Sequence, residues 1–321
     1  MKKKSIFITG GAGYIGTTLI PMLLAQNYKV TVYDSLLFNN GDTLIPFMSD
    51  NEFEFIRGDV RDKENLHTAM KDHDVVIHLA ALVGFPLCKQ AGEDETHSVN
   101  VEGTRAVLEG LTDNQYLLFG STGSNYGVVT DICTEETPLN PLSSYGVTKT
   151  IAEKEVMVRG NSTAFRFATA FGVSPRLRLD LLVNDLTYKV MTDGYVVIYE
   201  AHFLRTFIHV KDIARSFMFA IDNQDDMVNE VYNVGSNNLN HSKREVCELI
   251  QSKVPKSLIH YAEIGEDADK RNYKVSYDKI HALGFETTLS LENGVNELTK
   301  TIKALSIVSD YHNVYNRVQN I

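Results

Sequence analysis

The feature that most constrains the fold is a glycine-rich stretch near the start of the chain, TGGAGYIG at residues 9–16. Residues 5–9 lead into it with the apolar character of a buried strand, and residues 14–26 continue it with the pattern of a helix. The early glycines permit a tight turn, Gly13 allows the backbone to approach a pyrophosphate, and Gly16 allows close packing of helix against strand. A turn of this kind presents free N–H groups to phosphates. It predicts a dinucleotide site, although a ligand-free glycine turn has the same letters.

Five residues of this turn are expected to contact the cofactor. They are Gly10, Gly13, Tyr14, Ile15 and Gly16.

Strand and helix patterns alternate through the first half of the chain. Further strands are expected at 29–34, 53–57, 74–80, 116–121 and 163–168, and helices at 63–71, 98–111 and 144–159. Continuous apolar strands between helices are typical of a parallel sheet covered on both faces. We therefore predict an α/β fold with a Rossmann-type, doubly wound parallel sheet.

The second half of the chain has a looser rhythm of helices and short strands. Helices are expected at 181–191, 210–221, 242–253 and 291–305, and strands at 196–199, 230–234 and 257–261. We expect residues 1–170 to form the nucleotide-binding domain, with later strands returning from about 205–235. Residues 171–321 are expected to form mainly a smaller, interleaved substrate domain, and no linker marks a sharp boundary.

Two acidic residues follow predicted strands at positions suited to adenosine. Asp34 lies 18 residues after Gly16, close to the spacing at which a carboxylate meets the adenosine ribose. The stretch 35–40 has no Arg or Lys that would hold a 2′-phosphate, which favours NAD over NADP. Asp59, with its neighbour Val60, is expected near the adenine. An Asp34 that only caps a turn would look the same in sequence.

Small residues end the strand expected at 74–80 and leave room for a bound cofactor. Leu79, Ala80 and Ala81 are therefore expected to line the cofactor site. His78, just before them, is expected to be a buried packing residue and not a catalyst.

One tyrosine–lysine pair has the spacing needed for acid–base chemistry. Tyr145 and Lys149 are four residues apart on a predicted helix, so their side chains share one face. A phenol with an ordinary pKa of about 10 is a poor base at neutral pH, but a nearby ammonium favours the phenolate. Lys149 is also expected to hold the nicotinamide ribose. The hydroxyls of residues 121–124 follow the strand expected at 116–121, where they either hold a substrate oxygen or form only a polar loop.

Composition narrows the possible partners. The formal net charge of −10 argues against nucleic-acid binding. The three widely spaced cysteines fit neither a disulfide framework nor a zinc site, and no metal is expected. The basic residues 2–4 are not followed by an apolar signal region, and no stretch approaches the length of a membrane span. A cytoplasmic location is expected.

Together these motifs carry a resemblance to a known family. The chain resembles the extended short-chain dehydrogenases of the NAD-dependent epimerase/dehydratase family over essentially its whole length, through TGGAGYIG at 9–16, GDVRD at 58–62, HLAA at 78–81, SVNVEGT at 98–104, STGSNYG at 121–127, YGVTK at 145–149 and RTFIHVKD at 205–212. The resemblance implies Thr122 as the catalytic hydroxyl, Tyr145 as the base and Lys149 as its partner. It also implies that Asn100 supports the cofactor region and that Arg205 reaches a substrate phosphate, unless Arg205 is merely a surface arginine.

The chain departs from the family pattern at two places that concern the substrate. Family dehydratases carry Asp-Glu directly after the catalytic Thr, whereas this chain has Gly123-Ser124, so 4,6-dehydration is not expected. Thr169 stands where the family often has an Asn that touches the sugar or diphosphate. Ser124 and Thr169 remain expected substrate contacts.

Three further arginines are expected to supply phosphate contacts. Arg176 and Arg178 lie after the strand expected at 163–168 and are either phosphate ligands or solvated loop charges. Arg271 resembles the family's late arginine and is expected at the diphosphate.

The resulting expectation is an NAD-dependent oxidoreductase that oxidises a hydroxyl of a nucleotide-diphosphate sugar, at C4, with Tyr145 as base. An epimerase is the main interpretation, and a net C4 dehydrogenase that releases NADH is the alternative. A non-catalytic NAD sensor is disfavoured because Thr122, Tyr145 and Lys149 are all retained. The family commonly dimerises through two helices, here 98–111 and 144–159, on which Val107, Leu111 and Ile151 line the interface or belong to the core.

Overall fold

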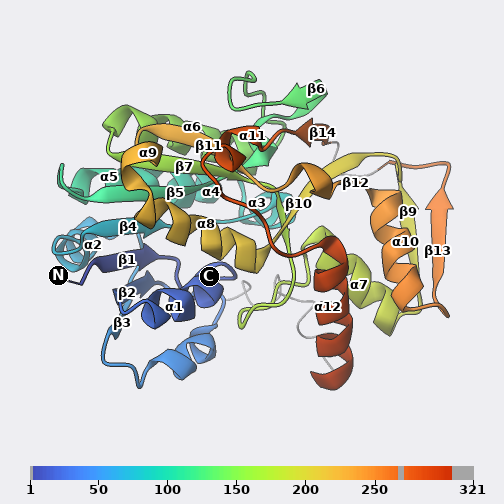
Figure 1. The fold of residues 1–321 in the computed structure, drawn as a ribbon, viewed down its shortest axis with the longest axis horizontal. Coiled ribbons are helices and arrows are strands. Elements are labelled where there is room, and N and C mark those ends of the chain that lie inside the picture. Colours follow the sequence, from blue (N-terminus) through green and yellow to red (C-terminus); the bar gives the residue numbers. More distant parts are fainter. Residues whose placement is uncertain (1–2, 267–270, 306–321) are drawn as a thin grey trace.

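Seven parallel strands form the main sheet of the computed structural model, which describes residues 3–266 and 271–305 (Figure 1). The spatial order is β3-β2-β1-β4-β5-β7-β11. The strands are β1 (Ser5–Thr9), β2 (Lys29–Asp34), β3 (Phe53–Arg57), β4 (Val75–His78), β5 (Tyr116–Thr122), β7 (Ser162–Phe167) and β11 (Glu230–Val234). Strand order reverses between β1 and β4, and ligands bind outside the carboxyl ends of strands at such a point. The predicted Rossmann-type α/β fold is confirmed.

Helices cover both faces of this sheet. Alternate residues of β1 point to opposite sides: Ile6 and Ile8 belong to one apolar core and Phe7 to another. The first core is closed by α1 (Gly16–Ala25), α8 (Val210–Asp222) and α9 (Gln224–Met227), and the second by α2 (Lys63–Met70), α5 (Gly103–Gly110) and α6 (Ser144–Arg159). This double cover explains why the strands are apolar throughout.

A third apolar core lies beside the main sheet, on the right in Figure 1. It is built from α7 (Leu182–Thr192), α10 (Lys243–Lys253), α12 (Leu291–Leu305), β9 (Tyr195–Tyr199) and β13 (Leu258–Ala262). Two further small sheets lie outside the main sheet: β8 (Thr169–Phe171) with β10 (Leu204–His209) and β12 (Asn240–Ser242), and β6 (Val128–Cys133) with β14 (Asn272–Val275). Of the predicted substrate residues, Thr169 begins β8 and Arg205 lies in β10.

The remaining elements are short. They are α3 (Phe85–Ala91), α4 (Glu93–His97), α11 (Asp278–His281), the π turn η2 (Ser98–Glu102) and the 3₁₀ turns η1 (Gly41–Phe47), η3 (Gly123–Asn125) and η4 (Asn237–Leu239). Within the described part of the chain, none of the helices combines the length and apolar character that crossing a bilayer requires.

Several predicted elements have the bounds expected from sequence, including β1, β2, β3, β11, α6 and α12. The helix expected at 98–111 starts instead with η2 and becomes α-helical only at α5. Strand β10 was not predicted with bounds of its own. Arg205, Thr206 and His209 are all buried in it, and polar side chains inside a buried strand conceal the apolar run that identifies one.

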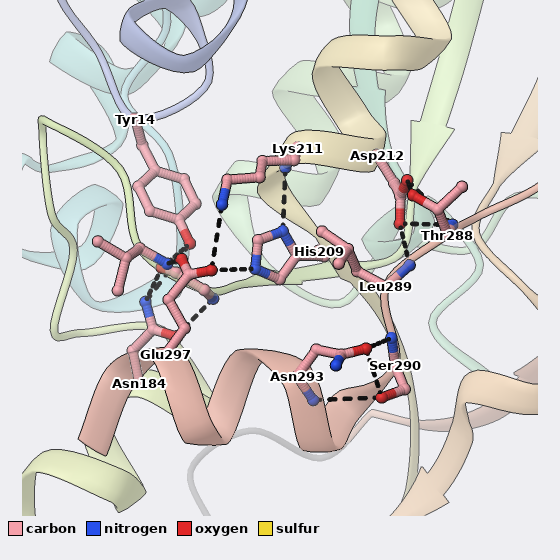
Figure 2. A network of polar contacts seen from close by, with 12 residues as sticks. Tyr14, Asn184, His209, Lys211, Asp212, Thr288, Leu289, Ser290, Asn293 and Glu297 are labelled. Atoms are coloured by element: carbon pink, nitrogen blue, oxygen red, sulfur yellow. Dashed lines mark hydrogen bonds and ion pairs between the residues drawn. The ribbon is translucent and has the colours of Figure 1, made fainter. Parts of the chain in front are cut away.

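Figure 2 shows a polar network that joins α12 to the turn after β8. Glu297 of α12 accepts a hydrogen bond from the Val173 backbone N–H at 2.7 Å and lies 3.5 Å from Nε2 of buried His209. On the other side of the turn, the Tyr14 hydroxyl donates to the Gly172 carbonyl at 2.6 Å. The turn is therefore held between the third core and the glycine-rich stretch.

Candidate active site

A cavity opens at the carboxyl ends of the strands, and most of the predicted site residues line it. These are Gly10, Gly13, Tyr14, Ile15, Gly16, Asp34, Asp59, Val60, Leu79, Ala80, Ala81, Thr122, Ser124, Tyr145, Lys149, Thr169, Arg176, Arg178 and Arg271. Of the predicted residues, Asn100 and Arg205 are not part of the lining. The cavity thus runs from the glycine-rich turn to the tyrosine–lysine pair, as a dinucleotide with an adjoining substrate requires.

Two positions of the glycine-rich turn have no room for a side chain. Gly10 has a φ of +70°, and a Cβ there would lie 2.6 Å from the Ala80 backbone nitrogen. A Cβ on Gly16 would lie 2.3 Å from the Gly11 carbonyl oxygen. Gly16 therefore allows helix α1 to start in close contact with the turn. This narrow backbone cradle fits a pyrophosphate.

Asp34 ends β2 beside this turn. Its carboxylate accepts hydrogen bonds from the N–H groups of Ala12 (3.0 Å) and Leu36 (2.8 Å). Burial raises the pKa of Asp34, while those two N–H groups and the Arg176 guanidinium lower it. Arg176 also stacks on Phe38, with the guanidinium carbon 5.2 Å from the ring centroid. Arg176, expected at a substrate phosphate, therefore lies at the same end of the cavity as Asp34.

Asp59 is committed to a neighbouring arginine. Both of its carboxylate oxygens accept from Arg61, at 2.9 and 2.7 Å, and these bonds lower the pKa of Asp59 although burial raises it. Arg61 also pairs with Glu95 at 3.0 Å. This pairing reduces the capacity of Asp59 to accept from an adenine. Asp62, three residues on, caps α2 by accepting a hydrogen bond from the Asn65 N–H group.

Tyr145 and Thr122 meet at the opposite end of the cavity. Burial raises the pKa of Tyr145 to about 12, while a side-chain hydrogen bond with Thr122 lowers it. Nearby Cys88 raises the pKa further, and the charges of Arg178 and Arg271 lower it. The largest cationic effects on the phenol thus come from two arginines, whereas the sequence assigned that effect to Lys149.

Lys149 lies one helical turn from Tyr145, and its side chain is enclosed. The residue is 3% exposed, and its ammonium is 3.9 Å from the centroid of the Phe119 ring. Burial lowers the pKa of Lys149 to about 7, and the charge of Glu153 opposes that shift. Lys149 therefore titrates close to neutral pH, which makes its charge state sensitive to its surroundings.

Asn100 supports the site from behind the cavity wall. Its side-chain amide pairs with both backbone groups of Leu82, at 2.8 and 3.0 Å, and donates to the Thr148 hydroxyl at 3.1 Å. It thereby connects the chain after β4 to α6. His78 is also behind the wall, as expected: it bonds Thr9 and Thr104, and burial lowers its pKa to about 3.

The end of the cavity near Tyr145 contains a charged cluster. Arg271 donates to the Ser124 hydroxyl at 2.5 Å. Arg178 forms two bonds with Asp180, at 2.5 and 3.0 Å, and Asp180 lines the cavity as well. The sequence analysis did not single out Asp180. The only signal in the sequence was its position two residues after Arg178.

Arg205 and Thr169 differ in position from what the sequence implied for them. Arg205 is 2% exposed and donates to the Leu204 carbonyl at 3.0 Å, so it is not a surface arginine. Its place in buried β10 keeps it outside the cavity lining. Thr169 begins β8 and does line the cavity.

The chain is similar to a family of known proteins. The model of the "NAD dependent epimerase/dehydratase family" matches residues 6–235. The chain is 25% identical over 314 residues to a putative UDP-glucose 4-epimerase of Methanocaldococcus jannaschii, covering 93% of this chain and 98% of the relative. It is 30% identical over 275 residues to a UDP-glucose 4-epimerase of Halalkalibacterium halodurans, covering 76% and 79%.

The fold is also similar to a solved enzyme. The crystal structure of UDP-glucuronic acid 4-epimerase from Bacillus cereus, in complex with UDP-glucuronic acid and NAD, superposes with a TM-score of 0.81 at 25% identity. The match covers 94% of this chain and 99% of that one.

Proposed function

Since the chain belongs to the NAD dependent epimerase/dehydratase family, we propose that it is a nucleotide-diphosphate-sugar 4-epimerase. The observation that carries the proposal is the joint lining of one cavity by Thr122, Tyr145 and Lys149 at one end and by the glycine-rich turn and Asp34 at the other. The cofactor is NAD. Its pyrophosphate would lie on the turn, its adenosine ribose at Asp34, and its nicotinamide ribose at Lys149.

The side chains at the catalytic end have separate tasks. Tyr145 takes the proton of the sugar C4 hydroxyl, and Arg178 and Arg271 favour the phenolate that does so. Thr122 holds the same sugar oxygen as it becomes a ketone. NAD⁺ supplies the hydride acceptor. Epimerisation follows when the ketone turns its other face toward the nicotinamide before it is reduced. Tyr145 then returns the proton to the C4 oxygen.

The substrate contacts are proposed for the residues nearest to Tyr145. Arg271, held by Ser124, and Arg178, held by Asp180, would face the diphosphate and the sugar. Thr169 would contact the sugar. We place Arg176 on the cofactor, because it lies beside Asp34.

A net C4 dehydrogenase is the second candidate, because it needs the same three catalytic residues. Dehydration is disfavoured by position 124, where Ser124 bonds Thr122 and Arg271 and offers no carboxylate. A non-catalytic NAD sensor is disfavoured by the complete catalytic set.

The test is incubation with NAD⁺ and a panel of UDP-, GDP-, CDP- and dTDP-sugars. We expect inversion at sugar C4, read by proton NMR, without accumulation of absorbance at the NADH band. Stoichiometric NADH with a keto sugar would favour the dehydrogenase. Absence of any conversion across the panel would contradict both activities.

We further propose that the protein acts in the cytoplasm as a homodimer formed through α5 and α6. Val107 is buried inside the protomer, so it belongs to the core and not to an interface. Leu111 and Ile151 remain partly exposed, and Arg105 bridges the two helices through Glu155.

A further inference from the structure

Beneath the catalytic end of the cavity lies a carboxylate that the proposed mechanism has not used. Glu153 is 3% exposed and stands on α6, one turn beyond Lys149 and two turns beyond Tyr145. The three residues share one helical face, because they are spaced by four and four. A buried carboxylate is expensive unless it is paired, so its presence here calls for a reason.

Glu153 forms a bidentate ion pair with Arg166 of β7. Arg166 Nη2 lies 2.6 Å from Oε1 of Glu153, and both side chains are almost fully enclosed. The arginine also donates to the Tyr126 hydroxyl and to the Glu135 carbonyl, each at 3.0 Å. Arg166 is thus shared between Glu153 and two further acceptors.

The same carboxylate holds the end of β5. Ser121 donates its hydroxyl to Oε2 of Glu153 at 2.5 Å, and Asn125 donates its amide to the same oxygen at 3.2 Å. Ser121 immediately precedes Thr122, and Asn125 closes the turn η3 that follows. Glu153 therefore fixes the two sides of the segment that presents the catalytic hydroxyl.

Side chains from three elements surround Lys149. Tyr145 and Glu153 share its own helix, and His78 faces it from β4. The Phe119 ring covers it from β5. His78 has its pKa lowered to about 3 and is neutral, while Glu153 is the charge that raises the pKa of Lys149 against its burial.

We propose that Glu153 is a positioning residue of the reaction, which holds Lys149 in its ammonium form and fixes Thr122 through Ser121. The inference rests on the proposed function in one respect, because it needs Lys149 to act as a cation at the nicotinamide ribose. Glu153 is thus added to the three proposed catalytic residues, in the spacing Tyr145-x₃-Lys149-x₃-Glu153. It is proposed to touch neither cofactor nor substrate.

The charge is tested with Glu153→Gln, which keeps the shape and removes the carboxylate. Lys149 should then lose its proton at lower pH, so NADH binding, followed by nucleotide fluorescence, should weaken at lower pH than in the wild type. Between about pH 6 and pH 8.5 we expect the loss of affinity to exceed the wild-type loss by about fivefold or more, because one pKa unit is a factor of ten in protonation. This readout does not depend on knowing the sugar.

Two further variants separate charge from structure. Glu153→Gln leaves Arg166 unpaired and risks unfolding, so Glu153→Gln with Arg166→Met removes both charges and should show the same displaced pH dependence. Ser121→Ala, the matched control, keeps the carboxylate and should leave the pH dependence in place while lowering kcat. A pH dependence identical to the wild type in either folded variant that carries Glu153→Gln would overturn the charge role.

Activity measurements separate this inference from the proposed function. Where the wild type converts a sugar, the alkaline limb of its kcat/KM profile should move with the NADH-binding profile in Glu153→Gln. Where the wild type converts none of the panel, the proposed function fails, and the binding profiles still decide the role of Glu153.

Discussion

At the scale of single residues, the catalytic end of the cavity is governed by burial. Burial raises the pKa of Tyr145 and lowers that of Lys149, so each group is pushed toward its neutral form. Thr122, Arg178 and Arg271 act against this effect at the phenol. The proposed chemistry therefore depends on neighbours that restore charge to a site that burial would neutralise.

Replacement of the proposed base is the direct test at this scale. Tyr145→Phe should lower kcat by about 10²–10⁴-fold, the usual contribution of a positioned general base. Affinity for NADH should stay within about threefold, because the ring and the helix remain. Turnover assays and nucleotide fluorescence measure the two quantities. Undiminished turnover in a folded variant would reject Tyr145 as the base.

The charge of Asp34 should determine which cofactor, NADH or NADPH, binds more tightly. Asp34→Asn keeps one acceptor for the Ala12 and Leu36 N–H groups but loses the charge that repels a 2′-phosphate. NADH affinity should fall by about tenfold or more, as for loss of a charge-assisted hydrogen bond, and NADPH affinity should fall less or rise because Arg176 is nearby. Parallel fluorescence titrations would contradict the assignment if both affinities fell equally.

At the scale of elements, the turn after β8 depends on contacts from three directions. Ser174 donates to the Tyr14 carbonyl at 2.7 Å, and Thr17 bonds Ser174 at 2.9 Å. Glu297 holds Val173 from α12 (Figure 2). This fixes the segment that continues to Arg176 and Arg178, so the third core helps to place the arginines of the cavity.

The acid stability of this junction follows from Glu297. Burial raises the pKa of Glu297, but His209, the Val173 N–H group and Lys211 have the larger, opposite effect and bring it down to about 2. A depressed carboxylate stabilises the folded state above its unfolded pKa and loses that contribution as pH falls from about 4.5 toward about 2. Glu297→Gln should lower the free energy of unfolding at pH 7 by on the order of 2 kcal/mol.

The same variant should lose less stability than the wild type on acidification through that window. Urea unfolding at several pH values measures both effects. Lys3→Gln, which removes an exposed ion pair with Glu52, is the control and should change little. If Glu297→Gln lost stability on acidification as steeply as the wild type, the contacts of Glu297 would contribute nothing to the acid stability.

Sequence patterns identified the features that neighbouring residues in the chain determine. The glycine turn, Asp34 and the Tyr145–Lys149 spacing each depend on one short stretch of the chain: a turn, the end of a strand and a helix. The position of Arg176 beside Asp34 and the importance of Glu153 depend on partners that only the fold brings together, across the β8 turn and across β5 and β7. No local spacing distinguishes those residues from solvated charges.

At the scale of the whole molecule, the double cover of the main sheet was predictable and the third core was less so. Apolar strands of the main sheet are continuous, whereas β8, β10 and β12 are short or carry buried polar residues such as Arg205 and His209. Of these short strands, β8 supplies Thr169 and Ala170 to the cavity lining. The sequence therefore predicts the strands of the main sheet more completely than the short strands outside it.

The proposed dimer would form through helices α5 and α6. Helices α5 and α6 lie together on one side of the sheet, with Ile151 half-buried on α6. We expect the wild type to sediment as a dimer at micromolar protein and Ile151→Lys to sediment as a monomer, because a charge at an apolar interface core is costly. Ile45→Lys, at an isoleucine that is 68% exposed on η1, is the matched control and should remain dimeric. A wild-type monomer, or dissociation of both variants alike, would place any interface elsewhere.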